Sequence, residues 1–123
     1  MSVTNSFTLR RRPLNAEFPK DHAAQLLAEV RVLGTLCSLA VTGEQRNELA
    51  QTLNHYSFLE PEHEIIFESI RALLLHHWFS YKSLAVNLNN RGFPDVDLDA
   101  YCAAALPSFD DALALARQLV SIA

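Results

Sequence analysis

The 123-residue sequence has few of the residues on which several classes of protein depend. Its 3 glycines are too few for the many tight turns of an all-β fold. Its 2 cysteines, Cys37 and Cys102, lie far apart among apolar neighbours and form no CxxC motif, so we expect reduced core thiols in a cytoplasmic protein. No apolar run approaches the roughly 20 residues of a membrane-spanning helix, and we expect no membrane partner.

Basic residues are also fewer than acidic ones, at 10 against 14. The formal net charge is −4, whereas a domain that binds nucleic acid by itself carries a basic excess, because neutralising phosphates supplies most of the affinity. We therefore expect no strong nucleic-acid binding by this domain. A small helical DNA-binding protein that uses Arg10–Arg12 with Lys82 and Arg91 stays open as an alternative. The N-terminus also lacks the apolar segment of a signal peptide.

The chain divides into an arm and a helical domain. Residues 1–19 have no hydrophobic period, which predicts a flexible or extended N-terminal arm. Residues 20–123 are predicted to form a single compact domain of about six helices. The first helix follows Asp21, a capping residue, and has one apolar stripe at spacings of four, three and four: Leu26, Val30, Leu33 and Cys37.

Start and stop signals divide the rest of the domain into five further helices. Their predicted starts are marked by capping residues or by a proline suited to a first turn, namely Thr42, Pro61, Ser80, Asp97 and Ser108. The helix from Pro61 to about His77 is apolar on much of its surface, so we expect it to be the most buried. Gly92 is predicted to end the fourth helix. The last two helices, with Leu98–Leu106 as the first of them, predict a C-terminal helical hairpin in an all-α fold.

The histidines and carboxylates are poorly spaced for a metal site or a catalytic site. In the stretch "FLEPEHEIIF", residues 58–67, Glu62, His63 and Glu64 are adjacent, and adjacent side chains on a helix diverge by about 100°. The Asp95–Asp99 loop lacks the glycine and glutamate of a calcium-binding EF-hand. We therefore predict no catalytic residue, no cofactor and no metal, and we interpret the glutamates as favourable charges at a helix N-terminus. A metal-dependent helical protein that uses His63, Glu62 and a distant carboxylate stays open.

No phosphate-binding loop, dinucleotide-binding motif or nucleophile elbow is present. An interaction module therefore remains, and its working surface would be made of exposed apolar side chains. Each aromatic candidate could equally belong to the core: Trp78, Phe79, Phe93, Tyr101 and Phe109.

The segment "AEVRVLGTLC", residues 28–37, resembles the opening motif of the N-terminal domain of bacterial replicative DNA helicases of the DnaB type. A second segment, at residues 58–67, and a third, "SLAVNLNNRG" at residues 83–92, are similar to later motifs of that family. The matching residues are Glu29, Val32, Leu33, Gly34, Phe58, His63, Phe67, Leu84 and Leu88. The resemblance covers residues 21–122, although the region after Gly92 is compressed and the ATPase domain of the family is absent. We predict that the His63 imidazole bonds to protein groups or water and holds the loop before its helix.

The resemblance implies a non-catalytic oligomerisation and protein-docking module in DNA replication. In the family this domain pairs through its C-terminal helical hairpin and contacts primase or a loader in the primosome. The expected partners are a second copy and a helicase, primase or loader protein. The candidate interface is Tyr101, Ala104, Phe109, Leu113, Ala116 and Val120. A primase-type helicase-binding domain is the alternative within the same process.

Overall fold

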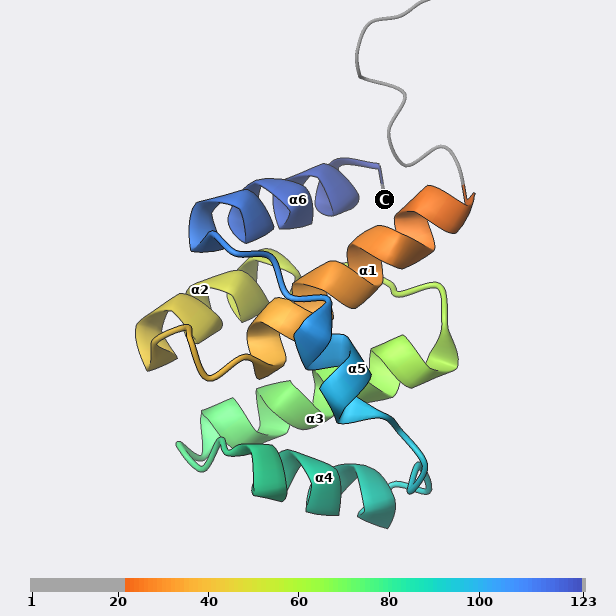
Figure 1. Ribbon diagram of the computed structural model, residues 1–123, viewed down its shortest axis with the longest axis vertical. Coiled ribbons are helices and arrows are strands. Elements are labelled where there is room, and N and C mark those ends of the chain that lie inside the picture. Colours follow the sequence, from red (N-terminus) through yellow and green to blue (C-terminus); the bar gives the residue numbers. More distant parts are fainter. Residues whose placement is uncertain (1–21, 123) are drawn as a thin grey trace, which may run out of the picture.

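The computed structural model describes residues 22–122, which fold into six helices and contain no strand (Figure 1). The helices are α1 His22–Cys37, α2 Gly43–Thr52, α3 Pro61–Leu75, α4 Tyr81–Asn90, α5 Leu98–Ala103 and α6 Phe109–Ser121. The predicted all-α fold in one compact domain is confirmed for these residues. The predicted arm at residues 1–19, including Arg10–Arg12, and the capping residue Asp21 lie outside the described residues. Within 22–122, no helix has both the length and the apolar character needed to cross a membrane.

Helix α1 is the central element of the fold. It packs against α2, α3, α5 and α6, and every residue from Val32 to Cys37 is buried. Figure 1 shows α6 on one side of α1, α3 and α4 on the other, and α5 crossing it. The prediction that the helix beginning at Pro61 is the most buried is wrong. Helix α3 contacts α1, α2 and α4, but its exposed face carries Leu75 at 75% exposure.

Local hydrogen bonds start the helices as predicted. At α2, the Thr42 hydroxyl accepts from the Gln45 N–H at 3.1 Å, and the Gln45 side chain accepts from the Thr42 N–H at 3.0 Å. These two bonds form a capping box. The side chains of Ser80, Asp97 and Ser108 likewise cap α4, α5 and α6. These contacts span three residues each, so sequence alone could identify them.

Two helices end in the same backbone motif. After α4, the Gly92 N–H donates to Asn89 O and the Phe93 N–H to Leu88 O, with Gly92 at φ 92°. After α3, the same pair of bonds runs from His77 to Leu74 O and from Trp78 to Leu73 O, with His77 at φ 59°. This pattern is the Schellman motif, whose left-handed position favours glycine. Helix α3 therefore ends at Leu75, two residues before the predicted end, with a strained histidine after it.

The C-terminal pair of helices, α5 and α6, is joined by residues 104–108. Helix α5 packs on α1, and α6 packs on α1 and α2. Helix α5 ends at Ala103 rather than at the predicted Leu106, and the Leu106 N–H instead donates to the Thr35 hydroxyl at 3.0 Å. The short helix α5 is thus held by its contact with α1.

Candidate functional site

A buried carboxylate, Glu29 of α1, is the centre of the polar interactions in the fold. Its exposed fraction is 0%. Oε2 accepts from the Tyr56 hydroxyl at 2.5 Å and from the Leu59 N–H at 2.9 Å, and Oε1 lies 2.8 Å from Nδ1 of His63. A carboxylate oxygen accepts, so Nδ1 is the donor. A carboxyl group can be buried only with such partners, because its desolvation is otherwise very costly.

These bonds join segments that are far apart in the sequence. Tyr56 and Leu59 belong to the connection between α2 and α3, and His63 lies in the first turn of α3. Gln25, one helical turn before Glu29, donates to the Tyr56 hydroxyl at 2.8 Å. We call Gln25, Glu29, Tyr56 and His63, with the Leu59 N–H, the Glu29 cluster. Glu29 fixes the α2–α3 connection to α1 through Tyr56 and Leu59. The predicted bond of the His63 imidazole to a protein group is confirmed, and this imidazole acts on the connection through Glu29.

The electrostatics of the cluster keep Tyr56 as a donor. Burial raises the pKa of the Tyr56 phenol; the bond from Gln25 opposes this rise, and the neighbouring Glu29 adds to it. The phenol therefore holds its proton and continues to donate to Glu29. A stable neutral donor beside a buried carboxylate is suited to structural support.

Aromatic rings contact two members of the cluster, Tyr56 and His63. The rings of Phe58 and Phe67 lie 5.1 Å apart between centroids, and Tyr56 contacts Phe58 edge-on at 4.9 Å. The His63 ring meets Tyr101 of α5 edge-on at 5.8 Å. Of the second motif, His63 bonds to the Glu29 carboxylate, whereas Phe67 is connected to the cluster only through its ring contact with Phe58.

Neighbouring carboxylates face other partners. Glu62 accepts from the Tyr101 hydroxyl at 2.6 Å, and Asp99 accepts from the Tyr81 hydroxyl. Burial, followed by the bond to Glu62, raises the pKa of Tyr101. Glu62 and His63 therefore point to different helices. Among residues 22–122, no three His, Cys, Asp or Glu side chains form a group that could hold a metal ion.

The Val-Leu-Gly part of the first motif marks the contact between α1 and α5. Val32 and Leu33 are fully buried. A Cβ atom at Gly34 would lie 1.9 Å from the Tyr101 carbonyl oxygen, so only glycine lets the two backbones approach this closely. The next residue, Thr35, accepts from the Leu106 N–H at the end of the same contact.

Sequence reasoning missed Arg46, a buried cation on α2. Its Nε donates to Leu36 O at 2.7 Å, and one terminal nitrogen donates to Ser38 O at 2.7 Å. The guanidinium therefore satisfies carbonyl oxygens at the end of α1 and directly after it, where the helix dipole favours positive charge. Its guanidinium also lies 4.2 Å from the centroid of the Phe79 ring. One signal was available, because Arg46 precedes Leu49 and Ala50 by three and four residues and so falls on the apolar stripe of α2.

The predicted interface residues separate into two groups. Tyr101, Leu113 and Ala116 are buried in the monomer, so they are core residues and cannot contact a partner in this conformation. The physical reason is that the inner faces of α5 and α6 pack on α1. The remaining three are half-buried or exposed, and Val120 is the most open at 36%: Ala104, Phe109 and Val120.

The aromatic candidates separate in a similar way. Phe79, Phe93 and Phe109 are half-buried and pack against the core, whereas Trp78, directly after α3, is 73% exposed. Leu84 and Leu88 of the third motif are buried on the inner face of α4. Of the five aromatic candidates, Trp78 is therefore the one that lies mainly on the surface.

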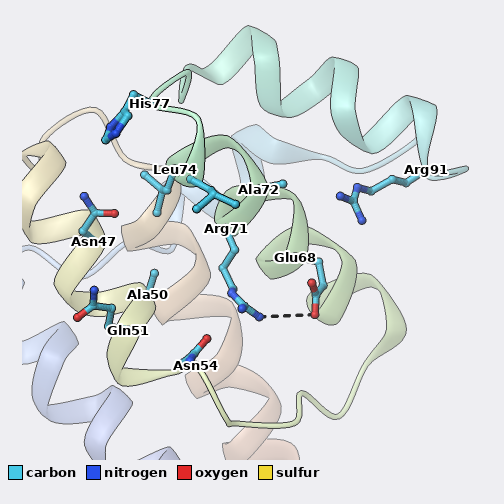
Figure 2. A pocket seen from close by; sticks show the side chains of 11 residues that line it. Asn47, Ala50, Gln51, Asn54, Glu68, Arg71, Ala72, Leu74, His77 and Arg91 are labelled. Atoms are coloured by element: carbon cyan, nitrogen blue, oxygen red, sulfur yellow. Dashed lines mark ion pairs between the residues drawn. The ribbon is translucent and has the colours of Figure 1, made fainter.

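A groove of about 660 Å³ runs between α2 and α3 (Figure 2). Its lining combines small or apolar side chains with amides and charged groups: Asn47, Ala50, Gln51, Asn54, Glu68, Arg71, Ala72, Leu74, Leu75, His77 and Arg91. Figure 2 shows Asn47, Gln51 and Asn54 on the α2 side, opposite Glu68 and Arg71 of α3. The groove lies apart from the Glu29 cluster and shares none of its residues.

Comparison of the chain with protein-family models, with curated proteins and with solved structures found no match. The resemblance to replicative helicases therefore stays a prediction from the sequence motifs alone.

Proposed function

We propose that this chain is a non-catalytic oligomerisation and protein-docking module that acts in DNA replication in the cytoplasm. It would correspond to the N-terminal domain of DnaB-type replicative helicases. Its partners would be a second copy and a helicase, a primase or a loader protein.

The observation that supports this proposal most is that residues of the first and second motifs contact each other in the fold. Glu29, Gly34, Phe58, His63 and Phe67 were selected by sequence resemblance alone. In the fold, Glu29 bonds His63, and Phe58 and Phe67 contact each other beside them. Gly34 admits α5 against α1 in the same region. The first and second motifs are thus joined by a direct bond between residues that lie 34 positions apart.

The surface supports a docking role. Large apolar side chains are exposed at one end of α3, at Leu75 and Trp78, and in the α1–α2 connection, at Leu39. Others, Val120 and Ile122, are exposed at the C-terminal end of α6. Tryptophan side chains such as Trp78 are enriched among the residues that carry most of the binding energy at contact surfaces. Self-association through the C-terminal helical pair would therefore use Val120 and its exposed neighbours.

Sedimentation velocity over a range of concentrations tests this function, with and without an added DnaB-type helicase or a bacterial primase. We expect concentration-dependent self-association that Val120→Asp weakens, and a complex with the helicase or the primase. A chain that stays monomeric at high micromolar concentration and binds neither protein would contradict the proposal.

A further inference from the structure

The α2–α3 groove carries an excess of basic side chains on an acidic domain. Residues 22–122 hold twice as many acidic as basic side chains. Two of the basic ones, Arg71 and Arg91, line the groove together with a single acidic side chain, Glu68. The local charge is therefore opposite in sign to that of the described chain as a whole, and it favours an acidic ligand.

Both guanidinium groups have donors free for such a ligand. The Nε of Arg91 donates to the Asn87 side chain at 2.6 Å, which orients the guanidinium. The terminal nitrogens of Arg91 have no partner among the described residues. Arg71 lies 3.9 Å from Glu68, and 43% of its side chain is exposed. An ion pair as long and as exposed as this is weak, so Arg71 can also bind a carboxylate of the ligand.

A row of unbonded amides lies along the other side of the groove (Figure 2). Asn47 and Gln51 are four residues apart on α2, and Asn54 follows just after that helix ends. Their side chains make no hydrogen bond to the other described residues. Each amide both donates and accepts, as each peptide group of a main chain does. Four residues of α2 rise about 6 Å, close to the roughly 6.4–6.8 Å between alternate residues of an extended peptide.

The groove is apolar at its base and short. Ala50 is buried there, and Ala72 and Leu74 are half-buried. Its volume of about 660 Å³ lies in the range of roughly 300–1,000 Å³ that is usual for ligand pockets. Helix α2 is about 15 Å long, which is the length of four or five extended residues. The groove therefore suits a short peptide segment better than the face of a folded protein, which needs about 800 Å² per partner.

A histidine that lines the groove has a strained backbone. His77 is at φ 59°, whereas the same position of the motif after α4 is a glycine, Gly92. The His77 side chain makes no hydrogen bond to the other described residues. Strained residues of this kind concentrate at ligand sites. The imidazole adds a further nitrogen that can donate to a carboxylate.

We propose that the α2–α3 groove binds a short acidic peptide in an extended conformation. Asn47 and Gln51 bond to the main chain of the peptide, and its alternate apolar side chains contact Ala50 at the base. Its carboxylates meet Arg71 and Arg91. This mode of recognition selects acidic character and alternating apolar side chains rather than one exact sequence. The inference goes beyond the proposed function, because it needs neither self-association nor a replication protein.

Fluorescence anisotropy with labelled hexapeptides tests this site in the full 123-residue chain. The probe is a peptide of alternating leucine and glutamate, and its matched control alternates leucine and lysine. We expect the acidic peptide to bind at least about tenfold more tightly than the basic one. The affinity for the acidic peptide should fall as the salt concentration rises, because the charges that bind it are exposed.

Matched variants separate the groove from the rest of the surface. Arg91→Glu should weaken binding of the acidic peptide at least about tenfold. Lys82→Glu makes the same change in charge at an exposed position of α4 outside the groove, and it should change the affinity by less than about twofold. The double variant Asn47→Ala/Gln51→Ala should weaken binding about fivefold or more. These positions are all exposed, and circular dichroism serves as the folding control.

An acidic peptide with a methylated main chain tests the role of the amides directly. It lacks the N–H groups that donate to Asn47 and Gln51, so the wild-type chain should bind it less tightly than the unmodified peptide. The double amide variant should bind the methylated and unmodified peptides with similar affinity, because the bonds in question are already lost.

Three results would overturn the peptide site. They are an acidic peptide that binds no better than the basic one, equal losses in Arg91→Glu and Lys82→Glu, and a double amide variant with wild-type affinity. Failure of the proposed function is a separate outcome. A chain that binds the acidic peptide but neither self-associates nor binds a helicase or primase supports the groove and contradicts the proposed function, and the reverse result rejects the groove alone.

Discussion

Replacing Glu29 by alanine removes the acceptor on which three buried donors depend. The Tyr56 hydroxyl, the Leu59 N–H and the His63 imidazole would each lose their bond to the carboxylate. An unsatisfied buried donor costs about 1–3 kcal/mol, and breaking a buried pair by removing one partner costs about 3–5 kcal/mol. Because the donors can relax partly toward water, we expect a loss of about 4 kcal/mol in the free energy of unfolding.

This loss is large for a domain of this size. Single domains are stable by about 5–15 kcal/mol in total, so Glu29→Ala should bring the chain close to unfolding at room temperature. The melting temperature should fall by roughly 15 °C, at a few degrees per kcal/mol. Glu29→Gln keeps one acceptor oxygen and most of the volume, so it should lose less than Glu29→Ala.

Urea unfolding followed by far-ultraviolet circular dichroism measures this difference. Trp78 fluorescence is a poor reporter, because that side chain is already 73% exposed in the folded state. Glu48→Ala is the matched control, since Glu48 is exposed on α2 and its loss should change stability by less than about 0.5 kcal/mol. If Glu29→Ala were as stable as Glu48→Ala, the Glu29 cluster would not hold the fold together.

Three further predictions concern single positions. Gly34→Ala should lower the free energy of unfolding by about 3 kcal/mol or more, because the new Cβ would lie 1.9 Å from the Tyr101 carbonyl oxygen and α5 would have to move. Urea unfolding measures this loss. A loss below about 1 kcal/mol would refute the close contact between α1 and α5. His77→Gly should raise the free energy of unfolding by about 0.5–1 kcal/mol, because glycine adopts the left-handed conformation without strain. Thermal unfolding measures this gain. A neutral or destabilised variant would argue against φ 59° at this residue. Burial raises the pKa of the Cys37 thiol from its ordinary value of 9.0 to about 12, so its contribution to stability is complete below pH 9 and is lost as pH rises toward 12, because the unfolded chain releases the proton first. The stability of the wild-type chain relative to Cys37→Ala should therefore fall as the pH rises above 9, and a constant difference would contradict the burial of this thiol.

Gly34 and Arg46 show what limits inference from one sequence. Gly34 entered only through the resemblance, since nothing local requires a glycine in the last turn of α1. Its requirement comes from Tyr101, 67 positions further along the chain. Arg46 lies on an apolar stripe, which indicated burial, but its partners Leu36 O and Ser38 O belong to another helix and its connection. Contacts of this kind have no local pattern.

The sequence by itself determined where most helices begin and where α4 ends. Capping residues such as Thr42 and Ser108, and the glycine at position 92, bond to backbone groups within three or four residues. Their effect can therefore be predicted from neighbouring positions in the sequence. Only the tertiary structure decided which faces are inside. It made α1 the central helix, buried Tyr101 and Leu113 against it, and left Leu75 and Trp78 exposed. The physical reason is that burial depends on how helices distant in the chain share one core, and the amphipathic stripe of a single helix does not specify its neighbours.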